Sequence, residues 1–350
     1  MVRRCLWLAF SFVLLLAIPF VPSAVAQTRS VVDDAGRTVE IPEQIERVMA
    51  AGPPAAVLLY ALAPDRMVGW VTAPNERARQ FIAEPYRDLP EHGRLTGRGG
   101  TANIEAVLAM QPDVIIDVGT VDDTYASLAD RVQEQTGIPY LLIAGRFADT
   151  AQTIRKAGEV LGEGETAERL AGYAEASLAR LETAIAAVPQ DERPRVYYGR
   201  GPDGLETGLA GSINMEVLDA VGAVNVAASA GAGGLANVSV EQVLSWNPDV
   251  ILTLDPAFHR SVGANPLWAG IAAVETGRIY RAPTLPFGWF DTPPGVNRLM
   301  SAAWLAGILY PDHVDMDLRA ETRDFYRLFY HVEVDDAQLD ALLAGAQGGS

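Results

Sequence analysis

Three arginines lie in predicted loops and could bind an anion. Arg146 and Arg200 each directly follow a predicted strand and a glycine, and Arg98 lies in a glycine-rich stretch. A guanidinium carries its N–H donors in a planar fork, which grips a carboxylate, catecholate, phosphate or oxyanion with two parallel hydrogen bonds. We therefore take these arginines as candidate ligand-binding residues, with a solvated surface charge as the alternative role for each.

Aromatic residues accompany the arginines in the predicted loops. An aromatic ring in such a loop could stack on a flat or organic ligand. Trp289 lies in the proline-stiffened run 285–294, which could hold its ring edge exposed, and core packing is the alternative role for this residue. The aromatic candidates are Tyr125, Tyr198, Phe258, Phe287, Trp289 and Phe290, of which we single out Tyr125, Tyr198 and Trp289.

The histidines and the single cysteine argue against a protein-bound metal ion. Four histidines are scattered along the chain with no pair spaced at i, i+4, and the only cysteine is Cys5. A closed divalent-cation site needs several nitrogen, oxygen or sulfur ligands that converge. We predict no metal-ligating residues and no cofactor. His259, in the predicted loop 255–260, remains a candidate for contacting a ligand.

Three well-known catalytic motifs are missing from the sequence. It contains no G-x-S-x-G elbow, no H-E-x-x-H and no P-loop. Adjacent carboxylates occur at Asp33–Asp34, in a predicted hairpin turn, and at Asp122–Asp123, before a predicted helix. We therefore predict that the protein is not an enzyme, with a chelatase-like or hydrolytic enzyme as the rival class.

One stretch occurs twice and reveals the elements that must position these residues. Residues 103–115 and 239–251 are offset by 136 positions and share seven of thirteen residues. Each copy begins with a capping residue, Asn103 or Ser239, and places a glutamate, Glu105 or Glu241, in the first helical turn. A Pro-Asp pair then ends the helix, and an apolar β-branched strand follows. The duplication predicts two similar lobes.

The order of elements predicts an α/β fold with two Rossmann-like lobes. Strands alternate with helices in each lobe, which favours mostly parallel sheets. Between the lobes, apolar residues recur at helical spacing from Ala167 to Ile185 and predict a single long bridging helix. Loops at the carboxyl ends of the strands should then face a ligand cleft between the lobes. The predicted boundaries are 27–148 for the N-terminal lobe, 149–188 for the bridging helix, 189–335 for the C-terminal lobe and 336–350 for a tail.

The N-terminal residues indicate where the protein is located, and the net charge limits the partners it can bind. Residues 1–26 combine Arg3 and Arg4, an apolar run and an Ala-Val-Ala site, a pattern typical of a cleaved secretion signal. The chain has 350 residues and a formal charge of −17. Such an acidic surface argues against nucleic acid and anionic lipid as partners and would suit a basic protein. We expect an exported, periplasmic monomer.

Together these features resemble the periplasmic substrate-binding proteins of ABC importers for iron–siderophore, haem and cobalamin. The resemblance rests on the two Glu/Pro-Asp units, the connecting helix, the export signal and the sequence of residues 32–39 near the start of the mature chain. It covers about residues 30–335. It implies an ABC permease and its ATPase as partners. It also implies that Glu105 and Glu241 dock into basic pockets of the permease. The alternative is that each glutamate only stabilises its helix N-terminus.

The resemblance implies a small ligand held between the lobes. A ferric siderophore or a similar metal chelate is the first expectation, because it is the commonest cargo of the family. The family's metal-ion members carry several cleft histidines, whereas only His92 and His259 lie in cleft-side loops of this sequence. Molybdate or tungstate, cobalamin and haem remain alternatives. A sensor that presents its ligand to a signalling receptor is a further alternative role.

Overall fold

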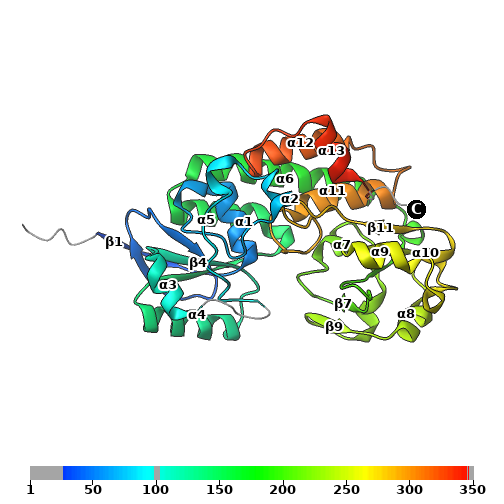
Figure 1. The fold of residues 1–350 in the computed structure, drawn as a ribbon, viewed down its shortest axis with the longest axis horizontal. Helices are drawn as coiled ribbons and strands as arrows, with labels where there is room; N and C mark the ends of the chain where they lie inside the picture. The colour runs from blue at the N-terminus through cyan, green and yellow to red at the C-terminus, as the bar shows by residue number, and fades with distance from the viewer. Residues whose placement is uncertain (1–26, 98–102, 345, 347–350) are drawn as a thin grey trace, which may run out of the picture.

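The computed structural model describes residues 27–97, 103–344 and 346, and it places them in two lobes along the long axis of the molecule (Figure 1). The predicted secretion signal 1–26 and Arg98 lie outside the described residues. Within the described ranges, no helix is both long and apolar enough to span a lipid bilayer.

The N-terminal lobe is built on a three-stranded parallel sheet in the order β3–β4–β5. A separate antiparallel hairpin, β1–β2, surrounds the predicted turn at Asp33. The Asp33 carboxylate accepts hydrogen bonds from the Arg37 guanidinium and the Leu142 backbone N–H, which fastens the hairpin to the sheet. The elements are β1 (Thr28–Val32), β2 (Thr38–Pro42), β3 (Val48–Ala50), α1 (Pro53–Leu62), α2 (Glu76–Arg79), α3 (Ile104–Met110), β4 (Val114–Gly119), α4 (Asp123–Thr136) and β5 (Tyr140–Ala144).

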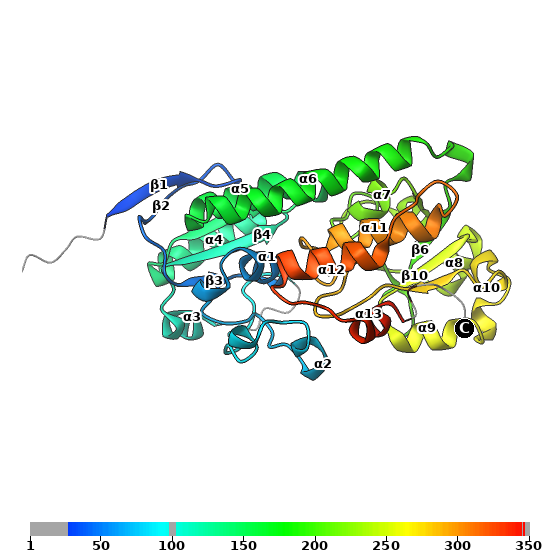
Figure 2. The same cartoon turned by 90° about the horizontal axis from the view of Figure 1, so that it is seen from above.

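The segment between the lobes forms two helices where the sequence predicted one over 149–188. The helix α5 (Thr150–Leu161) packs beside the N-terminal sheet, and α6 (Gly164–Ala186) runs along both lobes (Figure 2). The break falls at Gly162, whose φ of 72° is the left-handed conformation that glycine adopts without steric cost. The long connection is therefore the 23-residue helix α6 alone.

The C-terminal lobe repeats the plan with a four-stranded parallel sheet in the order β11–β10–β6–β8. A small antiparallel pair, β7–β9, lies beside it. The segment after α9 forms the 3₁₀ turn Pro266–Trp268 and then α10. The elements are β6 (Arg195–Tyr198), β7 (Glu206–Gly208), α7 (Glu216–Ala220), β8 (Val224–Asn225), β9 (Leu235–Asn237), α8 (Val240–Trp246), β10 (Val250–Thr253), α9 (Pro256–Val262), α10 (Ala272–Glu275) and β11 (Ile279–Arg281).

Three C-terminal helices complete the molecule. The helices α11 (Arg298–Leu309) and α12 (Leu318–Phe329) lie near α6 and extend back toward the N-terminal lobe (Figure 2). The predicted tail contains a further helix, α13 (Asp336–Leu343), which begins with a capping box and buries Leu339. A helix forms there because three leucines of the segment pack against the core, a pattern too short to be recognised in the sequence.

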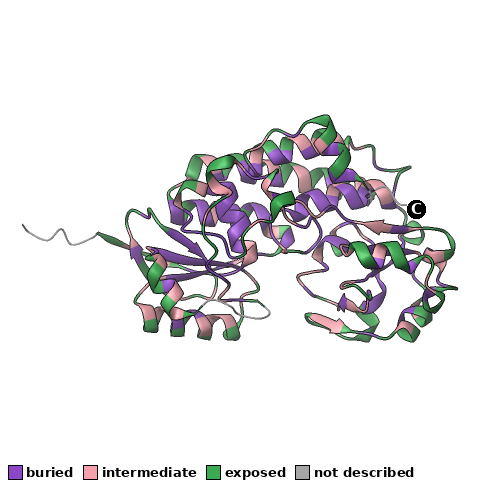
Figure 3. Cartoon of the chain, viewed as in Figure 1, coloured by how far each residue is buried: buried purple, intermediate pink, exposed green. Residues whose placement is uncertain are grey.

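One apolar core joins the two lobes. Each sheet turns one face to a cluster of its own and the other to a shared cluster that includes residues of α6, α11 and α12. Alternating residues show the division, because Ile115 lies in the N-terminal lobe's own cluster while Ile116 lies in the shared one. Figure 3 shows the buried residues concentrated in the strands and in the helices between the lobes. The predicted fold class, two α/β lobes with mostly parallel sheets, is confirmed.

Both copies of the repeated stretch fold as predicted. The helix α3 is capped by the Asn103 side chain, which accepts from the Ala106 backbone N–H at 2.7 Å. The helix α8 is capped by Ser239, which accepts from the Gln242 backbone N–H at 3.3 Å. Each helix ends at a residue in the left-handed conformation just before the proline, and a buried strand follows.

Candidate functional site

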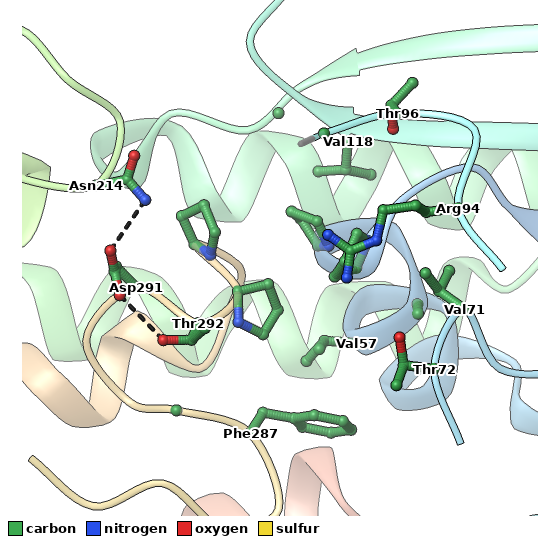
Figure 4. A pocket seen from close by; sticks show the side chains of 18 of the residues that line it. Val57, Val71, Thr72, Arg94, Thr96, Val118, Asn214, Phe287, Asp291 and Thr292 are labelled. Carbon is green, nitrogen blue, oxygen red and sulfur yellow. Dashed lines mark hydrogen bonds between the residues drawn. The ribbon is translucent and has the colours of Figure 1, made fainter. Parts of the chain in front are cut away.

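A cleft of about 860 Å³ lies between the lobes. Its walls come from the loops after β3, β4 and β6 and from the segment 284–294, as expected for the carboxyl ends of parallel strands. Side chains from both lobes face it (Figure 4). The lining is largely apolar, with prolines, Trp70 and Phe287, and includes Arg94, Asp117, Tyr125, Arg200, Asn214 and Asp291.

A buried carboxylate marks the N-terminal wall. Asp117, on β4, accepts hydrogen bonds from the Thr96 hydroxyl at 3.1 Å and the Tyr140 hydroxyl at 3.3 Å. Burial raises the pKa of Asp117 from an ordinary 3.8 to about 6, although these hydrogen bonds act in the opposite direction. The Thr96 hydroxyl can occupy this position because residue 52 is a glycine, since a Cβ there would lie 2.5 Å from the Thr96 hydroxyl oxygen. The wall therefore holds a group that gains a proton at mildly acidic pH.

The substitution Asp117→Asn should remove a pH dependence from the stability of the protein. The folded state binds this proton more tightly than the unfolded chain, so ionisation destabilises the fold as the pH rises from about 4 to 6. A shift of this size corresponds to about 3 kcal/mol. Urea unfolding at pH 4.5 and 7.5 should show wild type losing stability relative to Asp117→Asn at the higher pH. Parallel behaviour of the two proteins would contradict the assignment, and the exposed Asp123→Asn is the control for losing one carboxylate.

Arg94 supplies a positive charge to the same side of the cleft. Arg94 lines the cleft, and its guanidinium points into the cavity (Figure 4). Arg94 lies four residues before Arg98, the arginine that the sequence predicts as a ligand-binding residue in this stretch. A guanidinium next to an apolar surface loses less of its interaction with a ligand anion to water than one in open solvent does.

A second buried carboxylate organises the C-terminal wall. Asp291 accepts hydrogen bonds from the Tyr198 hydroxyl at 2.6 Å, the Asn214 amide at 3.0 Å and the Thr292 hydroxyl at 3.0 Å. Its carboxylate also lies 3.3 Å from Nε of Arg200. Burial raises the pKa of Asp291, and the Arg200 charge opposes that rise. The network fixes Arg200 at the edge of the cavity.

Two of the seven predicted ligand-binding residues line the cleft. Tyr125 lies at the start of α4, and Arg200 lies just beyond β6. Tyr198 is buried behind the cleft lining, where its hydroxyl donates to Asp291, so it positions a residue of the cleft without lining the cleft itself. Arg98 lies outside the described residues.

The structure places the other three predicted residues away from the cleft lining. Trp289 is fully buried, and its indole N–H donates to the Tyr326 hydroxyl at 3.2 Å. His259 lies on α9, where burial and the nearby Arg281 lower its pKa. The Arg146 side chain is 71% exposed and borders a separate groove beside α6. These positions follow from the rotation of each element, which a loop-level prediction does not specify.

Sequence reasoning missed several residues of the cleft. Asp117 lies in the buried strand β4, and its signal in the sequence is a lone carboxylate in an otherwise apolar run. Asp291 was read only as part of the proline-rich run, where it is the one acidic residue between Leu285 and Pro294. Trp70 lies outside the named strands, makes an isolated bridge to Glu91 and lines the cleft.

No cation site is evident in the part of the chain that the structure describes. Within residues 27–97, 103–344 and 346, no group of three or more His, Cys, Asp or Glu side chains could hold a metal ion. The two cleft carboxylates belong to opposite walls, and Asp291 already accepts from several donors. The cleft chemistry offered by these residues is hydrogen bonding, charge pairing and apolar contact.

A family model described as periplasmic binding protein matches residues 49–285. The chain belongs to this family. Its fold is similar to an ABC transporter solute binding protein from Sulfurospirillum deleyianum, at 30% identity and a TM-score of 0.82, covering 90% of this chain and 99% of the other. The chain is thus a periplasmic solute-binding protein of the ABC-transporter type, which works with a permease, an ATPase and a small ligand.

Relatives of this binding protein carry different ligands. The molybdate-binding protein MolA of Haemophilus influenzae is 28% identical over 327 residues, covering 86% of this chain and 91% of MolA. The solved structure of MolA bound to molybdate has a TM-score of 0.73 at 26% identity and covers 88% of this chain and 99% of that one. A cobalamin-binding protein of Halobacterium salinarum is 26% identical and covers 71% of this chain and 64% of the relative.

Proposed function

We propose that this binding protein captures an anionic metal chelate, such as a ferric siderophore, in the cleft between its lobes and delivers it to the permease. The main observation in support is a cavity of about 860 Å³ with an apolar and aromatic lining. The Arg94 guanidinium points into this cavity. A cavity of this size is in the range that holds an organic ligand of drug size. The guanidinium supplies a directed contact for an anionic oxygen of the chelate.

A compact oxyanion such as molybdate is the second candidate. The similarity to MolA favours it, and Arg94, Arg200 and the hydroxyl of Tyr125 could surround an oxyanion. The volume of the cavity favours the chelate, because a tetrahedral oxyanion would leave most of the apolar lining unused. A naked divalent cation is the least suitable ligand, since the described residues offer no converging set of ligands. A cobalamin or haem would need the same apolar contacts as the chelate.

The proposed route of delivery uses the repeated glutamates. Glu105 and Glu241 lie exposed in the first turns of α3 and α8, one on each lobe. We propose that both dock on basic pockets of the permease, that residues 1–26 direct export, and that the protein acts as a monomer without enzymatic activity. A receptor-presenting sensor would bind its ligand in the same cleft but would not support uptake.

A thermal-shift panel on the purified protein tests the ligand assignment. The panel contains ferric siderophores, haem, cobalamin, molybdate, tungstate and divalent cations. A ligand at about 100 times its dissociation constant should stabilise the fold by about 2.7 kcal/mol. Ferric siderophores are expected to give the largest shift, and a response to molybdate and tungstate alone would overturn that choice.

Two arginine variants separate the cleft from the neighbouring groove. The substitution Arg94→Gln should weaken binding of the active ligand by about tenfold to a hundredfold, because a hydrogen bond to a charged group contributes about 1.5–3 kcal/mol. Arg146→Gln removes the same charge from outside the cleft and should leave affinity unchanged. Isothermal titration measures both, and the reverse ranking would place the ligand away from the cleft.

A further inference from the structure

The repeated stretch presents the same surface twice. Val107 and Val243 are both fully buried, and each packs into the apolar cluster of its own lobe. One position later, Leu108 and Leu244 are exposed by 45% and 38%. Each leucine stands three residues after the exposed Glu105 or Glu241, so leucine and glutamate share one helix face.

Matching contacts hold the two helices in the same way. The Arg47 guanidinium donates to the Gln111 carbonyl at 2.9 Å and to the Met110 carbonyl at 2.6 Å, at the end of α3. At the end of α8, Arg195 donates to the Trp246 carbonyl at 2.7 Å. Because an arginine at the start of a neighbouring strand fixes each helix end, the equivalence extends to how the helix sits on its sheet.

The aspartates that follow the helices complete the match. The Asp113 carboxylate accepts from the backbone N–H of Arg47 at 2.8 Å, and the Asp249 carboxylate accepts from that of Arg195 at 2.8 Å. Figures 1 and 2 show α3 on one lobe and α8 on the other, both on the side of the molecule away from α6. The chain therefore carries two matching copies of one small surface, one per lobe.

The exposed leucines are not explained by folding. A single exposed apolar residue is ordinary on a protein surface. Among the described residues, the exposed large apolar side chains are Val32, Leu108, Val224, Leu244 and Leu267. Two of these five stand at equivalent positions of the repeat, beside the same acidic residue, which is the arrangement expected of a surface that meets two similar partners.

We propose that Leu108 and Leu244 are apolar anchors that insert into two matching hollows, each beside a basic group, on a permease with two like halves. This rests on the proposed docking role of Glu105 and Glu241. Each leucine would supply affinity by leaving water, whereas each glutamate would orient the approach and select the basic partner. The surface is thus a pair of mixed apolar and acidic contacts, and the charges alone are not sufficient for tight docking.

The experiment measures binding of this protein to the cognate permease–ATPase complex in lipid nanodiscs at several salt concentrations. The single variants Leu108→Ser and Leu244→Ser should each weaken binding by about tenfold, and the double variant by about a hundredfold. The loss should persist at high salt, because apolar contacts are not screened. Leu267→Ser, at a leucine that is 66% exposed outside the repeat, is the matched control and should bind like wild type.

The outcomes separate this inference from the proposed function. If the leucine variants bind normally while Glu105→Arg with Glu241→Arg abolishes binding, the anchor proposal is wrong and the docking role stands. If neither pair affects binding, the docking role itself fails. For each variant, the thermal unfolding temperature is also measured, as is the affinity for the ligand that gives the largest shift in the panel. These measurements distinguish loss of folding or of ligand binding from loss of docking.

Discussion

The double charge reversal Glu105→Arg with Glu241→Arg is expected to abolish ligand uptake while leaving ligand affinity unchanged. Both carboxylates lie on exposed helix faces outside the cleft lining, so their loss should not reach the ligand. In the proposed complex each would face a basic group, and an arginine there converts attraction to repulsion, which costs several kcal/mol at each contact. Uptake is measured in cells lacking the wild-type protein, and ligand affinity by titration.

The control for that variant must change the net charge by the same amount. Glu134→Arg with Glu275→Arg does so on exposed residues of α4 and α10, one on each lobe and outside the repeat. Uptake should remain near the wild-type rate in the control. Normal uptake in the Glu105 and Glu241 variant would contradict the docking role, and equal loss in both variants would point to overall charge.

The substitution Arg298→Met should lower the free energy of unfolding by about 3–5 kcal/mol. Arg298 is only 2% exposed, at the first turn of α11. Its guanidinium donates to the Gly145 carbonyl of the N-terminal lobe at 2.7 Å, and to the Ile213 carbonyl and the Glu216 carboxylate of the C-terminal lobe at 3.0 and 2.9 Å. Removing it would leave a carboxylate and carbonyls of both lobes without this partner.

Urea unfolding compares Arg298→Met with Arg319→Met. Arg319 makes two ion pairs, to Asp336 and Asp340, but its side chain is 39% exposed, and surface pairs contribute about 0–1 kcal/mol. A loss below about 1 kcal/mol at Arg298 would show that the buried contacts are replaceable. The companion Glu216→Gln should recover part of the stability in the double variant, because it removes the uncompensated charge.

The architecture was largely predictable because its signals are local. The N-caps Asn103 and Ser239, the stops at Pro112 and Pro248, and the apolar runs after them each act within a few residues, and all fold as predicted. The break at Gly162 is hard to predict because a glycine within a helical pattern does not always end the helix. The helix α13 is not recognised in the sequence because a two-turn helix carries too few apolar positions.

The site was less predictable because side-chain direction depends on packing. Because side chains alternate along a strand, Tyr198 points into the shared core, where its hydroxyl donates to Asp291. The local sequence does not indicate which face of the strand lies toward the cleft. Trp289 is held inward by Tyr326, a residue 37 positions away. Asp117 reaches the cleft because β4 ends there, a fact that emerges only when the lobes are assembled.

The apolar cluster shared by the two sheets has a thermodynamic consequence. Neither sheet can expose its inner face without opening the cluster that also covers its neighbour. The lobes should therefore melt in one cooperative transition, unlike domains on a flexible tether, which melt separately. Half-unfolded chains, with one lobe intact and one cleavable by proteases, would then be rare, and cargo bound at the cleft would protect the whole chain.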